Sequence, residues 1–122
     1  MSKKVPKVLI VDDEEGIRES LKLILGDHYD IILTDSGEQA LRVLEADPSI
    51  ALVLMDIKMP KVDGLDVLKE MKAKRPSLKV IMVTGYKAVE TASEAARLGA
   101  SGYIIKPFKS DEILNTVRRN LA

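Results

Sequence analysis

Short apolar runs alternate with longer amphipathic segments along the chain. A run of aliphatic residues predicts a strand that is buried on both faces, whereas apolar positions three and four residues apart predict a helix with one buried face. A helical pattern follows each of the apolar runs. The predicted strands are Lys7–Val11, Tyr29–Thr34, Ile50–Met55, Lys79–Val83 and Gly102–Ile105.

Strand and helix thus alternate five times with short connections. This pattern predicts right-handed crossovers and a parallel sheet that is covered by helices on both faces. We expect an α/β protein with a flavodoxin-like, doubly wound (βα)5 fold and the strand order 2-1-3-4-5, in which the first and third strands are neighbours. The second strand is less uniformly apolar than the others, so it is expected at an edge of the sheet.

Polar residues mark where several helices begin. The acidic run Asp12–Glu15 can open the first helix, and Ser36-Gly37-Glu38-Gln39 fits a capping box at the start of the second. Ser110 is the expected cap of the last helix. The fourth helix, roughly Val89–Leu98, is rich in alanine and is expected to be the least firmly packed, because it has little apolar area to bury.

Composition narrows the class of protein. The chain has 122 residues, of which 46% are apolar and 31% charged, as in a soluble globular domain. Because 19 basic residues balance 19 acidic ones, we expect no direct contact with nucleic acid. The absence of cysteine excludes disulfides and thiolate metal sites, and no apolar run is long enough to cross a membrane. A cytoplasmic location is the default expectation.

Polar residues directly follow four of the predicted strands. Asp12 and Asp13 follow the first strand, and Asp56 follows the third. Thr84 follows the fourth strand and Lys106 the fifth. Open α/β folds place ligands at the carboxyl ends of their strands, so we expect these side chains to form one site.

The chemistry of this set indicates Mg²⁺ and a phosphate group. Three neighbouring carboxylates repel one another and therefore require a cation, and oxygen ligands from few protein groups suit Mg²⁺. The hydroxyl of Thr84 and the ammonium of Lys106 are donors for an anion. A carboxylate at such a site can be a nucleophile, which makes Asp56 the candidate for an aspartyl phosphate.

Four motifs at these strand ends resemble those of the receiver domain of two-component response regulators. The resemblance covers nearly the whole chain, and four motifs in the family's order are far more specific than any one alone. The motifs are Val11-Asp12-Asp13-Glu14, the run from Leu54 to Pro60 with Asp63-Gly64, Val83-Thr84-Gly85 and Ile105-Lys106-Pro107-Phe108.

The resemblance implies a role for each residue of the metal and phosphoacceptor site. Asp56 matches the phosphoacceptor, which takes its phosphoryl group from a phosphohistidine of a sensor histidine kinase or phosphotransfer protein. Asp13 matches a direct Mg²⁺ ligand, and Asp12 an acidic partner that acts largely through water. Asp56 also belongs to the metal ligands, and the backbone carbonyl of Lys58 matches the third protein ligand. The side chains of Lys58 and Tyr86 are expected to flank the phosphoryl group.

The resemblance also implies a conformational switch. Thr84 and Lys106 match the residues that hold the phosphoryl oxygens, and Lys106-Pro107 matches a cis peptide bond. Tyr103 matches an aromatic residue that turns inward with Thr84 and remodels the surface of the fourth helix, fifth strand and fifth helix. That surface is a candidate homodimer interface. The alternative interpretation of Tyr103 is an ordinary strand aromatic, and the switch role is favoured over it.

The family implies a signalling module rather than an enzyme, since it catalyses only its own phosphotransfer and dephosphorylation. Residues 1–122 are expected to form a single receiver domain without an effector domain. The chain is then either a single-domain regulator or a receiver from a longer protein.

Each site residue also has an ordinary structural interpretation. Asp12 and Asp13 can begin a helix, and Asp56 can open a turn. Thr84 can be a strand-end residue and Lys106 a solvated lysine. The joint arrangement of all five favours a site over these separate roles.

Two other functions fit parts of the pattern. A Mg²⁺-dependent phosphohydrolase of the haloacid-dehalogenase type would also use an aspartyl nucleophile, but it needs an Asp-x-Asp spacing and a capping insertion that this chain lacks. A flavin-binding module needs a phosphate-cradling loop after the first strand, where Asp12–Glu15 would repel the flavin phosphate.

Overall fold

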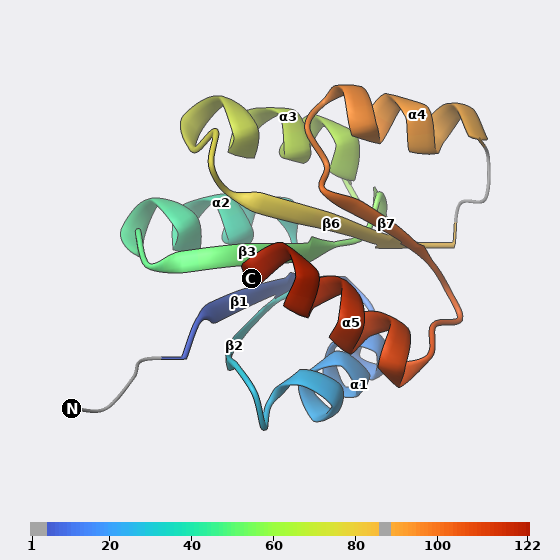
Figure 1. Ribbon diagram of the computed structural model, residues 1–122. Helices are drawn as coiled ribbons and strands as arrows, with labels where there is room; N and C mark the ends of the chain where they lie inside the picture. Colours follow the sequence, from blue (N-terminus) through green and yellow to red (C-terminus); the bar gives the residue numbers. More distant parts are fainter. Residues whose placement is uncertain (1–4, 86–88) are drawn as a thin grey trace.

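The computed structural model describes residues 5–85 and 89–122, which form a five-stranded parallel sheet flanked by helices (Figure 1). The strand order is β2-β1-β3-β6-β7, which confirms the predicted order 2-1-3-4-5 and places β2 at an edge. The strands are β1 Lys7–Val11, β2 Asp30–Thr34, β3 Ile50–Met55, β6 Lys79–Thr84 and β7 Gly102–Ile105.

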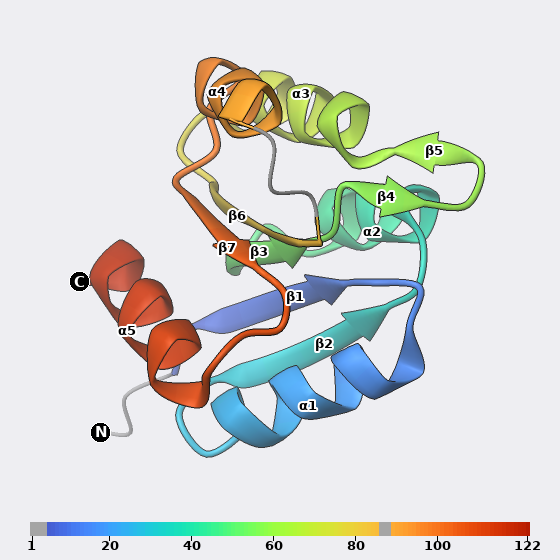
Figure 2. The same ribbon diagram turned by 90° about the vertical axis from the view of Figure 1, so that its right-hand side faces the viewer.

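The five helices of the described residues cover the sheet in two layers (Figures 1 and 2). One face carries α1 and α5, and the other carries α2, α3 and α4. The helices are α1 Glu15–Leu25, α2 Gly37–Ala46, α3 Gly64–Lys74, α4 Val89–Arg97 and α5 Ser110–Leu121. In residues 5–85 and 89–122, no helix has the length and apolar character that a membrane span requires.

Successive residues of the central strands face opposite helical layers, as the two-residue period of a strand requires. In β3, Leu52 and Leu54 pack in the core under α1 and α5, whereas Val53 and Met55 pack under α2 and α3. Burial on both faces explains why these strands are continuous apolar runs rather than alternating ones.

A short hairpin, which the sequence pattern did not predict, follows β3. Its strands are β4 Lys58–Met59 and β5 Val62–Asp63, joined through Pro60 and Lys61. Lys61 adopts a positive φ of 68°, at the turn position where glycine or asparagine is usual. Strands of two residues are too short to show a hydrophobic period, so only a loop was expected there.

Two helix starts differ in detail from their predictions. Ser36 caps α2 by accepting a hydrogen bond from the Gln39 N–H, as predicted, but the Gln39 side chain accepts from the Asp35 N–H rather than from Ser36. The prediction that Ser110 caps α5 is wrong. Lys109 holds the cap position without a side-chain bond, and Ser110 is the first helical residue.

Candidate functional site

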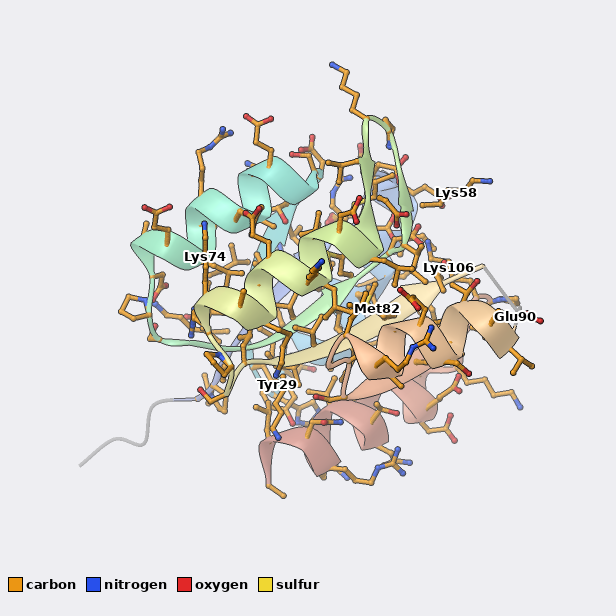
Figure 3. All side chains as sticks on the ribbon, turned by 90° about the horizontal axis from the view of Figure 1, so that it is seen from above. Tyr29, Lys58, Lys74, Met82, Glu90 and Lys106 are labelled. Carbon is orange, nitrogen blue, oxygen red and sulfur yellow. The ribbon has the colours of Figure 1, made fainter. Side chains whose placement is uncertain are left out.

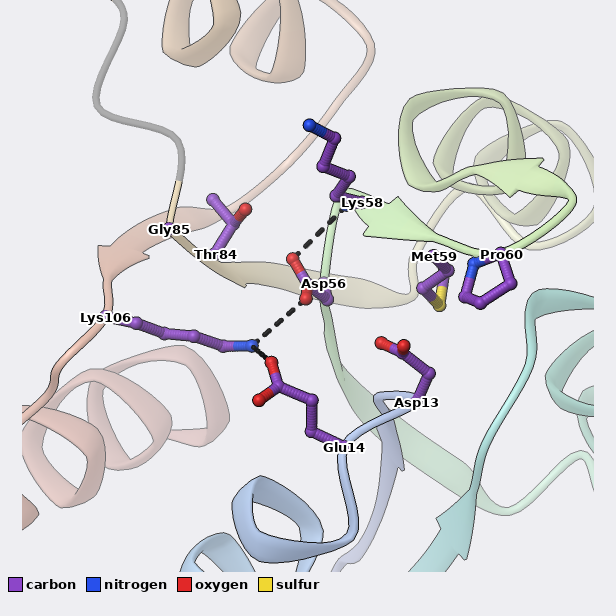
Figure 4. Close-up of a pocket in the computed structure, with 9 residues that line it drawn as sticks. All are labelled: Asp13, Glu14, Asp56, Lys58, Met59, Pro60, Thr84, Gly85 and Lys106. Atoms are coloured by element: carbon purple, nitrogen blue, oxygen red, sulfur yellow. Dashed lines mark hydrogen bonds and ion pairs between the residues drawn. The ribbon is translucent and has the colours of Figure 1, made fainter.

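An open pocket of about 680 Å³ lies at the carboxyl edge of the sheet, where β1, β3, β6 and β7 end (Figure 4). Figure 3 shows Lys58 and Lys106 at this end of the molecule and Lys74 at the opposite end. The pocket is lined by Asp13, Glu14, Asp56, Lys58, Met59, Pro60, Thr84, Gly85 and Lys106.

The register of the central strands brings the acidic residues together. Val11 of β1 pairs with Met55 of β3, and the Asp56 N–H continues the ladder with a 3.1 Å bond to the Val11 carbonyl. One carboxylate oxygen each from Asp12, Asp13 and Asp56 therefore lies within 4.8 Å of the others. Asp12 and Asp56 are only 1% and 5% exposed, whereas Asp13 is open to solvent.

Asp12 is a buried carboxylate held by two donors. It accepts hydrogen bonds of 2.9 Å from the Glu14 N–H and from Lys106 Nζ. Burial raises the pKa of Asp12, because a charged carboxylate is poorly solvated in the interior; these two bonds oppose the shift without cancelling it. Proximity to the Asp56 charge adds a smaller upward contribution to that pKa.

Lys106 spans the pocket and bridges residues distant in sequence (Figure 4). Its Nζ lies 2.9 Å from Asp12 and 3.0 Å from Asp56, and 3.5 Å from the exposed Glu14. Burial favours the neutral amine, but the hydrogen bonds and charges of Asp12 and Asp56 outweigh it and raise the pKa of Lys106. The ammonium therefore neutralises part of the acidic cluster.

Thr84 closes the pocket from the end of β6. Its side chain is 1% exposed, and its backbone carbonyl accepts a 2.8 Å bond from the Lys106 N–H. This bond fixes the ends of β6 and β7 relative to each other. On the other side of Asp56, the Lys58 N–H donates a 3.3 Å bond to the Asp56 carboxylate.

Comparison with known proteins identifies the class of this site. The family model described as the response regulator receiver domain matches residues 8–118. The chain belongs to this family. Receiver domains act as signalling switches in two-component systems, and the acidic pocket of this receiver is of the kind at which the family typically uses Mg²⁺.

Several relatives are similar over nearly the whole receiver domain. Response regulator protein FleR of Pseudomonas aeruginosa is 41% identical over 116 residues, which are 93% of this chain and 24% of FleR. Regulatory protein AtoC of Escherichia coli K12 is 42% identical over 118 residues, covering 96% of this chain and 25% of AtoC. The receiver thus spans about a quarter of the length of these curated relatives.

Solved structures show the same fold. A CheY-like response regulator receiver domain from Methanospirillum hungatei JF-1 superposes with a TM-score of 0.92 and 33% identity. The alignment covers 97% of this chain and 94% of that one.

The donor chemistry of the acidic cluster fits Mg²⁺. Mg²⁺ prefers oxygen ligands, keeps several waters and is usually held by one or two carboxylates together with phosphate. The receiver offers three converging carboxylates, of which only Asp13 is freely exposed to the open pocket. No rearrangement of the strands is needed to present these oxygens to a cation.

Tyr103 lies apart from the residues that line the pocket. It is half-buried on β7, packs against the core on the face of the sheet that carries α4, and lines a pocket together with Ala95 and Ala100. The cis bond expected between Lys106 and Pro107 is present. Tyr86, the other expected flanking residue, lies outside the described residues.

Two residues near the site have roles that the sequence analysis did not assign. Glu14 lines the pocket beside Lys106, and Arg18 donates a hydrogen bond to the Asp12 carbonyl. Glu14 was interpreted only as part of an acidic helix start. The sequence shows that Arg18 lies one helical turn after Glu14. This spacing alone does not reveal which atom the Arg18 guanidinium contacts.

Proposed function

We propose that this receiver accepts a phosphoryl group on the Asp56 carboxylate, from a phosphohistidine of a sensor kinase or phosphotransfer protein. The arrangement of Asp56 carries the proposal. Its carboxylate lies within an acidic cluster, contacts the Lys106 ammonium at 3.0 Å and borders an open pocket. A nucleophile, a cation site and an anion donor are thus within reach of one phosphoryl group.

In the proposed reaction, an Asp56 carboxylate oxygen attacks the phosphorus atom. The new P–O bond forms as the P–N bond to the donor imidazole breaks, and the imidazole keeps the electron pair and takes up a proton. Bound Mg²⁺ supplies neutralisation of the negative charge on the phosphoryl oxygens and the carboxylates. Hydrolysis of the resulting acyl phosphate returns Asp56 to its starting state.

Lys106 and Thr84 would hold the phosphoryl group. Lys106 donates to both Asp12 and Asp56, so its ammonium needs only a small movement to donate to a phosphoryl oxygen instead. The Thr84 side chain borders the same pocket from β6. The proposed Mg²⁺ ligands are Asp13, Asp56 and the backbone carbonyl of Lys58, and Asp12 is proposed to act on the metal largely through water.

The proposed output is a change on the face formed by α4, β7 and α5. Among the described residues of α4, Ala95 alone is buried, so few contacts must break for this helix to shift. Tyr103 packs against the same helix from β7. Coupled movement of Thr84 and Tyr103 would remodel this face for a partner or a second copy of the receiver.

Intact-mass spectrometry after incubation with acetyl phosphate tests the phosphoacceptor. The wild type is expected to gain one labile phosphoryl group only when Mg²⁺ is present, and Asp56→Asn none. Asp35→Asn, at an exposed aspartate just after β2, is the matched control and should react as the wild type does. Equal labelling of wild type and Asp56→Asn would overturn the assignment.

A turnover assay separates this proposal from phosphohydrolase activity. A receiver should not hydrolyse a generic phosphomonoester over many turnovers. Sustained release of phosphate that Asp56→Asn abolishes would show an enzyme rather than a switch.

A further inference from the structure

We propose that Arg18 is a positioning residue for the Mg²⁺ site, an inference that rests on the proposed function. Arg18 lies on α1 and does not line the pocket. Its guanidinium donates a 2.8 Å hydrogen bond to the backbone carbonyl of Asp12. This contact joins the first helix to the loop that carries two of the three clustered carboxylates.

The Arg18 contact completes the anchoring of Asp12. The Asp12 N–H donates a 3.2 Å bond to the Thr34 carbonyl, and the two carboxylate oxygens accept from the Glu14 N–H and from Lys106. The backbone carbonyl is the remaining polar group, and Arg18 holds it. Asp12 is thereby fixed through every hydrogen-bonding group that it has.

The same contact restrains Asp13 through covalent geometry. The carbonyl of Asp12 and the N–H of Asp13 belong to one planar peptide unit, so holding the oxygen fixes the direction in which the chain enters Asp13. In the part of the chain that the structure describes, no hydrogen bond orients the exposed Asp13 carboxylate. Its position within 4.8 Å of the other carboxylates therefore depends on this peptide plane.

The Arg18 side chain is suited to hold the peptide plane between Asp12 and Asp13. Its guanidinium is always charged, and hydrogen bonds from charged donors are roughly twice as strong as neutral ones. The side chain is half-buried, and the helix beneath it is fixed by the buried Leu21 and Leu25. The anchor is therefore attached to a rigid element rather than to another loop.

A positioning role and a purely electrostatic role predict opposite effects. If Arg18 acted only as a positive charge near the acidic cluster, its removal would make the site more attractive to a cation and raise Mg²⁺ affinity. If Arg18 holds the Asp12–Asp13 peptide, its removal lets Asp13 turn away and lowers Mg²⁺ affinity. The sign of the change distinguishes the two roles.

The test is a Mg²⁺ titration of the unphosphorylated receiver, followed by the NMR shifts of its backbone amides. Arg18→Met is expected to bind Mg²⁺ about five-fold more weakly than the wild type, the effect of having to order about one residue of backbone when the metal binds. Arg18→Lys, which keeps the charge and one donor, should recover part of the affinity. Arg42→Met removes an exposed arginine on α2 and should bind as the wild type does.

Each outcome has a distinct meaning. If Arg18→Met binds Mg²⁺ as tightly as the wild type, or more tightly, the positioning role is overturned. The proposed function would remain intact. A wild type that binds no Mg²⁺ would instead overturn the metal site itself, and with it this inference. Melting in EDTA reports whether each variant folds. If Arg18→Met does not fold, Arg18→Ala, which also removes the donor, takes its place with the same expected and overturning results.

Discussion

Asp13 is the least neutralised residue of the acidic cluster. Lys106 pairs with Asp12 and Asp56, so one ammonium already offsets part of the charge of those two carboxylates. Asp13 adds a further negative charge within 4.8 Å of them. Without metal this charge is a source of repulsion rather than of stability.

Asp13→Ala should therefore raise the melting temperature in EDTA by a few degrees, corresponding to about 0.5–1 kcal/mol. Circular dichroism melts measure the effect. Asp27→Ala, at an exposed turn outside the cluster, is the control and should change little. A clear drop for Asp13→Ala would mean that this residue stabilises the loop instead.

Asp47 is expected to make the folding stability depend on pH in the acidic range. Hydrogen bonds from the Ser49 hydroxyl, from Lys7 and from the Ser49 N–H lower the pKa of Asp47 to about 2. Since the folded pKa is below the unfolded value, the carboxylate stabilises the fold above about pH 4, and this stabilisation is lost as the pH falls towards 2.

Asp47→Asn should accordingly be less stable than the wild type at pH 7, and the difference should vanish as the pH approaches 2. Urea unfolding at a series of pH values measures it. A difference that stays constant down to pH 2 would contradict the assigned cause, because an uncharged contact has no such dependence.

At the scale of single elements, glycine positions show how tightly the end of β3 is packed. A Cβ at Gly64, the first residue of α3, would clash with the Asp56 carbonyl oxygen and lie 2.7 Å from Ile57 Cα. A Cβ at Gly16, in α1, would have nothing within 4 Å. The start of α3 therefore supports the end of β3 by direct backbone contact.

Gly64→Ala should destabilise the receiver by about 1–3 kcal/mol, because the backbone around Asp56 must shift. Gly16→Ala is the matched control and should stabilise it by about 0.5 kcal/mol, since alanine favours a helix. Urea denaturation measures both. Equal effects of the two substitutions would contradict the close contact at Gly64.

Helix α4 should be the least protected helix in hydrogen exchange. Ala95 is its single buried residue among those described, whereas α3 buries four residues, including Leu68 and Met71. Little buried apolar area means a low free energy of local opening. Amide exchange followed by NMR measures it, with α3 as the internal reference. Protection of α4 equal to that of α3 would remove the physical basis for its movement.

The sequence predicted those elements whose signals are local and repeated. The apolar runs of the five strands and the polar residues at their ends were sufficient to place Asp56 beside Asp12. The β4–β5 hairpin was not predicted because its strands are too short for a period. The wrong cap at Ser110 and the unassigned Arg18 share a cause, since both depend on side-chain and backbone geometry that composition and spacing do not encode.

At the scale of the whole molecule, metal binding and folding stability are linked. The carboxylates of Asp12, Asp13 and Asp56 are brought together only by the fold, so Mg²⁺ held there as proposed would bind the folded state in preference to the unfolded one. At ten times its dissociation constant, Mg²⁺ should stabilise the wild type by about 1.4 kcal/mol.

Thermal melts with Mg²⁺ and with EDTA measure this stabilisation. Asp13→Ala should lose most of it, whereas Asp27→Ala should retain it. A shift of equal size in the wild type and in Asp13→Ala would mean that the cation acts elsewhere on the receiver.

The burial of Asp56 also restricts which phosphate donors could reach its carboxylate. Asp56 is only 5% exposed, whereas Glu14, Lys58 and Pro60, which line the same pocket, are open to solvent. Under the proposed function, a small donor such as acetyl phosphate would enter the open pocket directly, whereas a folded donor protein would have to present its phosphoryl group on a side chain that projects from its surface. Discrimination between donor proteins would then depend on the surface around the pocket rather than on Asp56.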